Sequence, residues 1–351
     1  MNILFLTGHP AQVHNFKCLK KELEFKNHKV FWIATDKDIS KYLLDFYDIK
    51  YTIQKKPGKT FLSKVLVLFS NSLKVFQFIR KNKIDIIVSR VSPYAAIAGI
   101  FTHAHHLALA DTESSGIYDS IFTKLVSKFI TAKSFQRTLR KDQIRFDGNI
   151  ELFYLHPNRF RPISSQEVNK LLGIQNNEPY VIMRFVSWDA YHDKGLQGFT
   201  NENKIKAANA FAKYARVFIS AEKELPKELE PYRIKIPPEK MHDVLAHARL
   251  FFGESGTMAS ESAVLGRPAI YLNKNWLGYL LDARKFRLLY AYKQDYKSQQ
   301  DAIEKGVALL SDTDLENKMA SCHQKFMKNK IDVAKFMLWF IENYPESAKI
   351  M

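Results

Sequence analysis

The sequence predicts an α/β protein made of two successive domains, each a parallel sheet covered by helices. Short apolar runs alternate with longer amphipathic segments along the first half of the chain, and the alternation starts again after residue 162. Runs that are apolar throughout are typical of parallel strands with both faces buried. The length, 351 residues, is that expected of about two domains.

The elements of the first half follow in order. An amphipathic stretch over Phe16–Phe25 predicts a helix, and five apolar runs predict strands. The predicted strands are Asn2–Leu6, Val30–Ala34, Ile84–Ser89, Leu107–Ala110 and Phe129–Thr131.

Tyr154–Pro162 interrupts this alternation with two prolines, an asparagine and two arginines, which predicts a linker. Beyond it, helices are expected at Lys204–Tyr214 and Met241–Ala248, and Leu315–Tyr344 is strongly helical. The predicted domains are therefore residues 1–158 and 159–330, with a C-terminal helix at 331–351 that packs back on the first domain. The predicted strands here are Tyr180–Phe185, Arg216–Ser220, Arg233–Ile236, Leu250–Phe252 and Ala269–Leu272.

Composition narrows the class of protein. Two cysteines, Cys18 and Cys322, exclude a disulfide framework and a four-cysteine zinc site. The N-terminus does not resemble a signal peptide, so a cytoplasmic location is expected. The net charge is +17, and residues 1–160 carry +12 of it. Such a basic first half favours an anionic partner, although a merely solubilising charge is the alternative.

Leu250–Leu272 is the most specific stretch of the sequence. An apolar strand ends at Gly253, a polar turn follows, and a helix opens with the small residues Met258-Ala259-Ser260. The unpaired amides and the positive dipole end of such a helix attract an anion. Glu261 lies one turn further on, where its carboxylate could accept hydrogen bonds from a ribose diol. A plain strand–turn–helix with a solvated Glu261 explains the same residues equally well.

This stretch resembles the donor-nucleotide motif of GT-B glycosyltransferases and of non-hydrolysing UDP-N-acetylglucosamine 2-epimerases. The matching residues are S-G-T-x-x-x-E followed by A-x-x-G-x-P-x-I. The resemblance implies that Ser255, Gly256 and Thr257 bind the diphosphate and Glu261 the ribose. Thr257 stands where a second glycine is common.

The N-terminal stretch is similar to the opening of the GT-B enzyme that adds N-acetylglucosamine in peptidoglycan synthesis. Thr7–His14 follows the first strand, and Asn27-His28-Lys29-Val30 matches that family's G-H-x-V turn with asparagine for glycine. The resemblance implies a ligand loop containing Gly8 and His9 and a functional His14. His14 and Asp111 are the two candidates for removing the proton of the acceptor hydroxyl. Capping or surface roles are the alternatives for both histidines.

Taken whole, the chain resembles a GT-B-like family catalogued under a domain of unknown function, with matching pieces spread over most of residues 1–272. The implied fold is GT-B: two Rossmann-like domains that face a cleft. A shared fold permits many reactions, so the reaction depends on the site residues.

Carboxylates at the carboxyl end of a parallel strand face the ligand crevice. Asp111 follows the fourth predicted strand and is expected to act as general base, assisted or oriented by Glu113; a helix cap is the alternative for both. The 2-epimerases have an acid after the third strand, where this chain has Arg90. That replacement argues against epimerisation and favours either an anionic acceptor at Arg90 or a structural ion pair.

In the second domain, Arg184, Ser187 and His192 follow the first strand, where GT-B enzymes contact the donor. Arg184 or His192 could neutralise the leaving diphosphate, so no metal or cofactor is expected. His103-Ala104-His105-His106 is a weak zinc candidate without a nearby acid or cysteine.

Phe61–Lys83 is basic and aromatic at near-helical spacing. It is predicted to be a helix packed in the core, with contact to an anionic membrane as the alternative. Its apolar stripe comprises Leu62, Val65, Leu66, Phe69, Leu73, Phe76 and Ile79.

The sequence therefore predicts an inverting, metal-independent glycosyltransferase of the hexosyl- or N-acetylhexosaminyl class, acting in polysaccharide biosynthesis. A UDP-sugar is the expected donor, and a glycan or lipid-linked molecule is the expected acceptor, with a peripheral position at the inner face of the membrane. A nucleotide-sugar 2-epimerase or hydrolase is the first alternative. The second is a non-enzymatic basic protein that binds membrane or nucleic acid, although no nucleic-acid-binding motif is present and nucleic acid is not expected as a partner.

Overall fold

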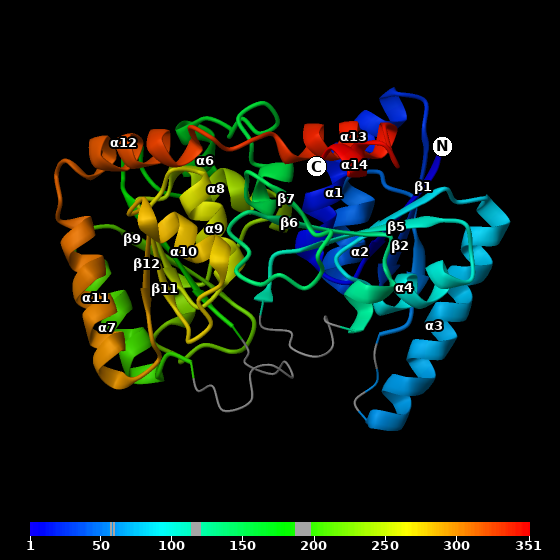
Figure 1. Ribbon diagram of the computed structural model, residues 1–351. Helices are drawn as coiled ribbons and strands as arrows, with labels where there is room; N and C mark the ends of the chain where they lie inside the picture. Colours follow the sequence, from blue (N-terminus) through cyan, green and yellow to red (C-terminus); the bar gives the residue numbers. More distant parts are fainter. Residues whose placement is uncertain (57, 59, 114–120, 187–197) are drawn as a thin grey trace. The chain divides into compact units, whose positions relative to one another are not determined.

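The computed structural model describes residues 1–56, 58, 60–113, 121–186 and 198–351. The chain forms two compact units, and each is an α/β unit with one parallel sheet (Figure 1). The first unit comprises Met1–Arg159 and Ile331–Met351, and the second comprises Phe160–Lys330. The C-terminal segment thus belongs with the first sheet, where helix α13 (Val333–Glu342) packs on α1 (Pro10–Phe25).

The sheet of the first unit has seven strands in the order β3-β2-β1-β4-β5-β6-β7, all parallel. The chain moves outward from β1 in one direction through β2 and β3, then returns to β4 and moves in the other direction. Right-handed crossovers therefore place α1 and α2 on one face and α3 and α4 on the other. The strands are β1 Asn2–Thr7, β2 Lys29–Thr35, β3 Thr52–Gln54, β4 Ile86–Ser89, β5 His105–Ala110, β6 Lys128–Ala132 and β7 Ile144–Phe146.

Buried aromatic rings fill the space between β1, β2 and α1. Phe5 stacks on Phe16 with ring centroids 5.1 Å apart, and Trp32 meets Phe5 edge-on at 5.2 Å. The Trp32 indole donates a hydrogen bond to Thr7 Oγ1 at 2.9 Å, so its one polar atom is satisfied in the core. The remaining helices of this unit are α2 Asp38–Phe46, α3 Phe61–Asn82, α4 Pro93–Ile100 and α14 Ser347–Ile350, with 3-10 turns at Thr123–Leu125 and Ile150–Phe153.

The sheet of the second unit has five parallel strands in the order β12-β11-β10-β8-β9. Its strands are β8 Tyr180–Phe185, β9 Arg216–Ala221, β10 Leu250–Gly253, β11 Ala269–Leu272 and β12 Leu289–Tyr292. Its helices are α6 Ser165–Leu172, α7 Asn201–Phe211, α8 Met241–His247, α9 Gly256–Val264, α10 Gly278–Lys285, α11 Tyr296–Leu310 and α12 Leu315–Met327, with 3-10 turns at Glu230–Tyr232 and Pro238–Lys240.

The predicted α/β class with two parallel sheets is confirmed, and several elements need correction. The predicted strand Arg233–Ile236 is wrong, because Arg233 makes only an isolated bridge to Ile219 before two prolines remove backbone donors. The predicted helix Leu315–Tyr344 is two helices, α12 and α13, separated at Lys328–Asp332 and belonging to different units. The helix predicted at Phe16–Phe25 begins earlier, with His9 as its N-cap and proline at its first position.

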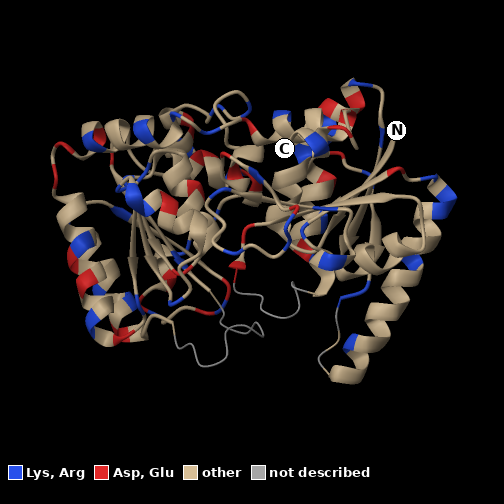
Figure 2. Cartoon of the chain, in the orientation of Figure 1, with Lys and Arg blue, Asp and Glu red and all other residues tan. Residues whose placement is uncertain are grey.

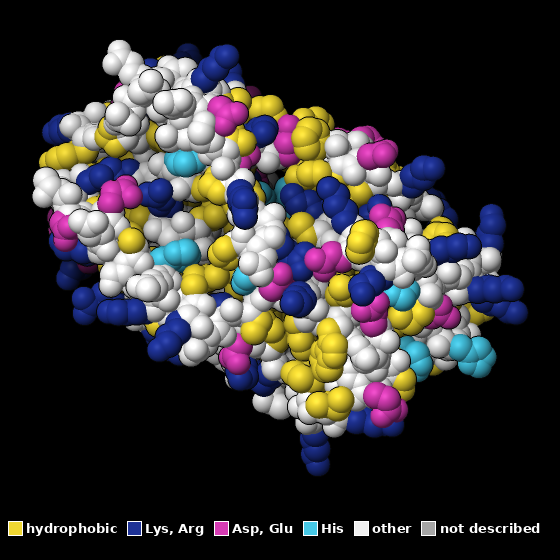
Figure 3. Space-filling view, turned by 90° about the horizontal axis from the view of Figure 1, so that it is seen from above, with side chains coloured by type: hydrophobic (Ala, Val, Ile, Leu, Met, Phe, Trp, Pro, Cys, Tyr) yellow, Lys and Arg dark blue, Asp and Glu magenta, His cyan; other side chains and the backbone are white. Residues whose placement is uncertain are grey.

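Charged side chains are spread over both units (Figure 2). On the face shown in Figure 3, Lys and Arg lie among acidic and hydrophobic side chains and form no continuous basic patch. The positive charge of the protein therefore forms no single patch on this face.

Candidate functional site

In open parallel sheets, ligands bind at the carboxyl ends of strands where the strand order reverses. In the second unit this switch point lies between β8 and β10, which are neighbours in the sheet. The residues that follow these two strands, Val186 after β8 and Glu254-Ser255 after β10, therefore lie at the edge of the sheet where such a ligand would bind. The predicted donor residues Arg184, Ser255, Gly256 and Thr257 all come from these two strand ends.

Helix α9 begins at this edge of the sheet. Ser255 is its N-cap, and the Ser255 hydroxyl accepts a hydrogen bond from the Met258 amide at 3.3 Å. The helix starts at Gly256, two residues earlier than predicted, so Gly256 and Thr257 form its first turn. Amides in the first turn have no acceptor within the helix. Together with the positive end of the helix dipole they can hold an anion such as a diphosphate.

Glu261 lies on α9 in the second turn and is only 5% exposed. The His242 Nε2 atom from α8 lies 2.9 Å from Glu261 Oε1 and fixes the direction of the carboxylate. Sequence reasoning missed His242, because α8 and α9 are brought together only by the fold. The solvated Glu261 of the alternative interpretation is wrong, since the side chain is buried and hydrogen-bonded.

Glu254 is a second buried acid that sequence reasoning missed; it is 3% exposed. Its carboxylate accepts hydrogen bonds from the Val186 amide at 3.0 Å and from the Phe199 amide at 2.5 Å. Glu254 thereby ties the end of β8 and the start of α7 to the end of β10. An acidic residue placed directly after an apolar strand is the sequence signal that could have identified it.

Two tyrosines complete the surroundings of the α9 N-terminus. A Cβ atom built on Gly256 would lie 3.0 Å from the Tyr279 hydroxyl and 3.4 Å from the Tyr271 hydroxyl. Phenolic hydroxyls can donate to phosphate oxygens. Their signal in the sequence is weak, because Tyr271 and Tyr279 lie in otherwise apolar segments.

The cationic side chains near this edge of the sheet already contact other groups of the protein. Arg184 donates to Ser220 Oγ at 2.7 Å and to Glu222 Oε1 at 2.5 Å, which directs its guanidinium toward β9. Burial lowers the pKa of Lys204, whose ammonium lies 5.1 Å from the centre of the Phe185 ring. A shallow pocket of ≈ 710 Å³ at the end of β9 is lined by Glu222, Lys223, Glu224 and Arg233. Ser187 and His192, the other predicted donor residues, lie outside the described residues.

In the first unit the switch point lies between β1 and β4. Gly8 and His9 follow β1, and Arg90 follows β4, so these acceptor-side candidates lie at the same edge of the sheet, where ligands of such sheets bind. The Gly8 amide donates to Gln12 Oε1 at 2.7 Å, and His9 Nδ1 accepts from the Ala11 amide at 3.2 Å. His9 therefore has the capping role that the sequence left open.

Arg90 and Asp111 form an ion pair at the ends of the adjacent strands β4 and β5. Asp111 also accepts a hydrogen bond from the Thr112 hydroxyl at 2.7 Å. The structural ion pair considered for Arg90 is thus present. Glu113 accepts a hydrogen bond from the Gln136 amide at 3.0 Å, so its carboxylate connects two loops.

His14 lies inside α1 and is 7% exposed. Its Nδ1 atom lies 3.3 Å from the Lys17 ammonium, and its ring contacts Tyr47 and Tyr154. An ammonium group can only donate, so Nδ1 is the acceptor of this hydrogen bond.

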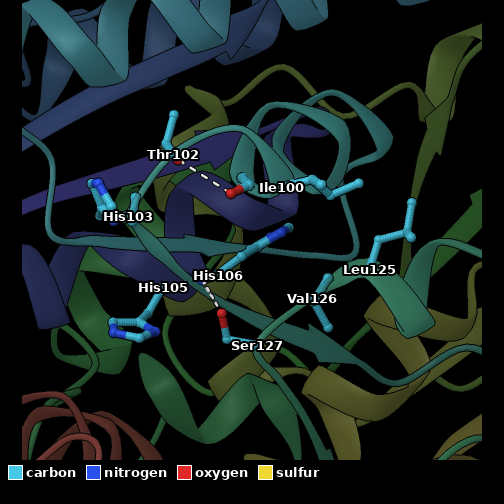
Figure 4. A pocket seen from close by; sticks show the side chains of 10 residues that line it. Ile100, Thr102, His103, His105, His106, Leu125, Val126 and Ser127 are labelled. Carbon is cyan, nitrogen blue, oxygen red and sulfur yellow. Dashed lines mark hydrogen bonds between the residues drawn. The ribbon is translucent and has the colours of Figure 1, made fainter.

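The histidines at 103, 105 and 106 do not converge (Figure 4). They line a pocket of ≈ 520 Å³ near the amino end of β5. Asp111 follows the other end of this strand, the carboxyl end. His105 packs against Tyr344, whereas His106 is buried with Nε2 2.7 Å from the Ser89 hydroxyl. Across the described ranges, no group of three or more His, Cys, Asp and Glu side chains is placed to hold a metal ion.

Burial lowers the pKa of His106 to about 3, which predicts a pH-dependent stability. The unfolded chain binds a proton near pH 6.5 and the native chain does not, so stability falls as the pH drops from about 6.5 toward 3. His106 alone should contribute a slope of up to about 1.4 kcal/mol per pH unit. Urea unfolding between pH 7 and pH 4.5 should show this slope reduced in His106→Gln. Replacing the exposed His103 with Gln is the control, and an equal slope in both variants would contradict the prediction.

Solved structures with this fold are numerous. MnaA of S. aureus, in a co-structure with UDP, superposes with a TM-score of 0.73 at 13% identity, covering 99% of this chain and 97% of its own. UDP-GlcNAc 2-epimerase from Neisseria meningitidis bound to UDP-GlcNAc gives 0.69 at 14%, covering 98% and 100%. A glycosyltransferase from Rickettsia africae gives 0.62 at 14%, covering 99% and 98%. At such identities the likeness shows the fold, which is that of the GT-B glycosyltransferases and the 2-epimerases.

Residues 3–323 match a family model described as "Protein of unknown function (DUF354)". The chain belongs to this family, as its resemblance predicted. No curated protein sequence matches the chain.

Proposed function

We propose that the protein is a glycosyltransferase that uses a nucleotide sugar, a UDP-sugar, as donor and a glycan or lipid-linked molecule as acceptor. The second unit binds the donor and the first binds the acceptor. The observation that carries the proposal is the α9 N-terminus at the switch point of the second sheet, with Glu261 buried one turn behind it. The UDP and UDP-GlcNAc held by two structural neighbours support the choice of uridine.

In the proposed donor site, backbone amides bind the negatively charged diphosphate and an oriented carboxylate binds the ribose. Amides at Ser255, Gly256 and Thr257 bind the diphosphate, and Glu261 accepts hydrogen bonds from the ribose hydroxyls. His242 holds the Glu261 carboxylate at 2.9 Å, so little ordering is needed when the ribose binds. Glu254 keeps the end of β10 rigid through its two backbone hydrogen bonds.

In the transfer step the acceptor hydroxyl loses its proton and its oxygen forms a bond to the anomeric carbon. The bond from that carbon to the diphosphate oxygen breaks, and UDP leaves with the electron pair. Asp111 or His14 takes the proton in this proposal. The α9 amides stabilise the charge on the departing diphosphate, so the step calls on no metal.

The donor site is tested by titrating UDP against the wild type, Glu261→Ala and Glu316→Ala in a calorimeter. Glu316 is a matched control, because it is an exposed acid of the same unit that pairs with Arg267 on the surface. Wild type and Glu316→Ala should bind alike, and Glu261→Ala at least about tenfold more weakly, since hydrogen bonds to a charged group are lost. Equal affinity of all three proteins, or no binding to the wild type, would remove the donor-site proposal.

A 2-epimerase is the second candidate, favoured by the TM-scores of 0.69 to 0.73 for UDP-bound and epimerase structures. Against it, Arg90 stands where the resemblance places an acid in the epimerases. Incubation with UDP-GlcNAc alone separates the candidates. An epimerase forms the 2-epimer and a hydrolase releases free sugar, whereas a transferase turns over only when an acceptor is added.

A further inference from the structure

Helix α3 carries apolar side chains on its outer side. Leu62, Leu66, Phe69 and Leu73 are 68%, 61%, 66% and 57% exposed, and we call these four residues the α3 apolar face. They follow one another at intervals of four, three and four residues, which places them on one side of a helix. Phe61, at the start of the helix, is 83% exposed. Single exposed apolar residues are common, but a contiguous row marks an interaction surface.

The opposite side of α3 is part of the fold. Its buried residues are Asn71, Ser72, Val75 and Ile79, in the middle and last turns, and α3 packs against α4. The expectation of a core-packed helix is therefore wrong for the α3 apolar face, which is exposed, and right for the buried side in the middle and last turns. The spacing of the apolar residues in the sequence predicts that they share one side of the helix, but it does not show whether protein or solvent lies against that side.

The charge around this face has one sign. Every charged residue from Lys55 to Lys83 is basic. Lys64, Lys74, Arg80 and Lys81 are exposed on the helix itself, and Figure 2 shows no acidic residue on α3. Exposed apolar side chains beside lysine and arginine complement the acyl region and the anionic headgroups of a membrane.

We propose that α3 docks the protein on an anionic lipid bilayer, with the α3 apolar face inserted at the level of the headgroups. Within the described residues α3 is also the helix whose length and composition would permit it to cross a membrane. It lies on the bilayer rather than across it, because its later turns are buried against the first unit and its charged side chains are distributed along its length.

The position of α3 connects docking to the site. The helix follows β3, so it begins at the carboxyl edge of the first sheet, where Gly8, Arg90 and Asp111 also lie. Docking would therefore hold this edge near the membrane surface. If the glycosyltransferase proposal holds, the acceptor is lipid-linked and reaches the site from the bilayer; this part of the inference rests on that proposal, whereas docking itself does not.

The test is co-sedimentation with vesicles of phosphatidylcholine alone or mixed equally with phosphatidylglycerol. The wild type should bind the anionic vesicles and lose binding in 0.5 M salt, because screening weakens attraction to the headgroups. Leu66→Glu/Phe69→Glu should lower the partition coefficient at least about tenfold. Phe25→Glu is the matched control, since Phe25 is 86% exposed at the end of α1, and it should bind like the wild type.

Three outcomes would overturn the proposal. The first is a wild type that ignores anionic vesicles, and the second is undiminished binding by Leu66→Glu/Phe69→Glu. The third is a wild-type dimer that this variant converts to a monomer without any vesicle binding, because a second copy of the chain would then cover the face. UDP affinity and thermal unfolding of the variant should match the wild type, so failure of docking and failure of the donor site are distinguishable.

Discussion

Gly253→Ala is expected to destabilise the second unit by about 3 kcal/mol or more. Gly253 is the last residue of β10 and pairs with Arg184 of β8. A Cβ at this position would lie 2.3 Å from the Arg184 carbonyl oxygen and 2.9 Å from the Arg184 nitrogen. Both atoms are backbone atoms of a paired central strand, so relief requires β8 and β10 to separate. No side chain can simply rotate away.

Thermal unfolding measures this effect, with a fall in Tm of roughly 6–12 °C for a unit of this size. Gly173→Ala is the control in the same unit. Gly173 has φ +66° and nothing within 4 Å of a built Cβ, so its substitution brings left-handed strain without crowding, about 1 kcal/mol. Losses of equal size in the two variants would show that the close approach of β10 to β8 is not what requires glycine at 253.

Gly253 also bears on the site, because Glu254 and the α9 N-terminus follow it directly. Separation of β8 from β10 would displace the two amides that Glu254 holds. UDP affinity of Gly253→Ala, measured well below its Tm, should therefore fall with stability, whereas Gly173→Ala should retain affinity. The glycine thus connects the packing of the sheet to the proposed donor site.

The strands that could be predicted best are those buried on both faces. Tyr180–Phe185 and Ala269–Leu272 have the predicted bounds because every side chain there is apolar or packed. Strands β3, β7 and β12 were missed. They are three or four residues long and lie at the edges of their sheets. Strands β3 and β7 contain polar residues, so no continuous apolar run marks them. Strand β12 lies in the apolar run Leu288–Tyr292, and periodicity cannot distinguish so short a run from a buried helical segment.

The candidate site likewise has parts that the local sequence predicts and parts that depend on the fold. The α9 turn could be predicted because all its parts lie within a dozen consecutive residues. The contact of His242 with Glu261 could not, since it joins two helices whose packing the local sequence does not specify. The Arg90–Asp111 pair lies between these cases: both residues follow strands, and only the strand order makes those strands neighbours.

Arg159→Ala should destabilise the first unit by roughly 3 kcal/mol, because it removes the centre of a buried ion-pair network. Arg159 Nε donates to Asp332 Oδ1 at 2.5 Å, and Arg159 Nη1 donates to Glu22 Oε1 at 2.6 Å. The side chains of Arg159 and Asp332 are each 9% exposed. Burial disfavours the charged guanidinium, but the hydrogen bonds to Asp332 and Glu22 outweigh it and raise the pKa of Arg159.

The alanine variant leaves Asp332 as a buried carboxylate without its guanidinium, and that uncompensated charge is the main cost. Asp332 is also the N-cap of α13, accepting from the Lys335 amide at 3.0 Å. Hydrogen exchange should therefore report faster opening of Val333–Glu342 before global unfolding. Lys349→Ala, which removes a fully exposed pair with Glu346, is the control and should leave exchange unchanged.

A double-variant cycle distinguishes this network from simple loss of packing. If the buried charge is the cause, Arg159→Ala combined with Asp332→Asn should be less destabilised than the sum of the single variants, because asparagine carries no charge to leave unpaired. Arg159→Lys should fall between wild type and alanine, since it keeps the charge and loses the second hydrogen bond. Strict additivity would instead assign the loss to the arginine stem. The ion pair would then contribute little to holding the C-terminal segment on the first sheet.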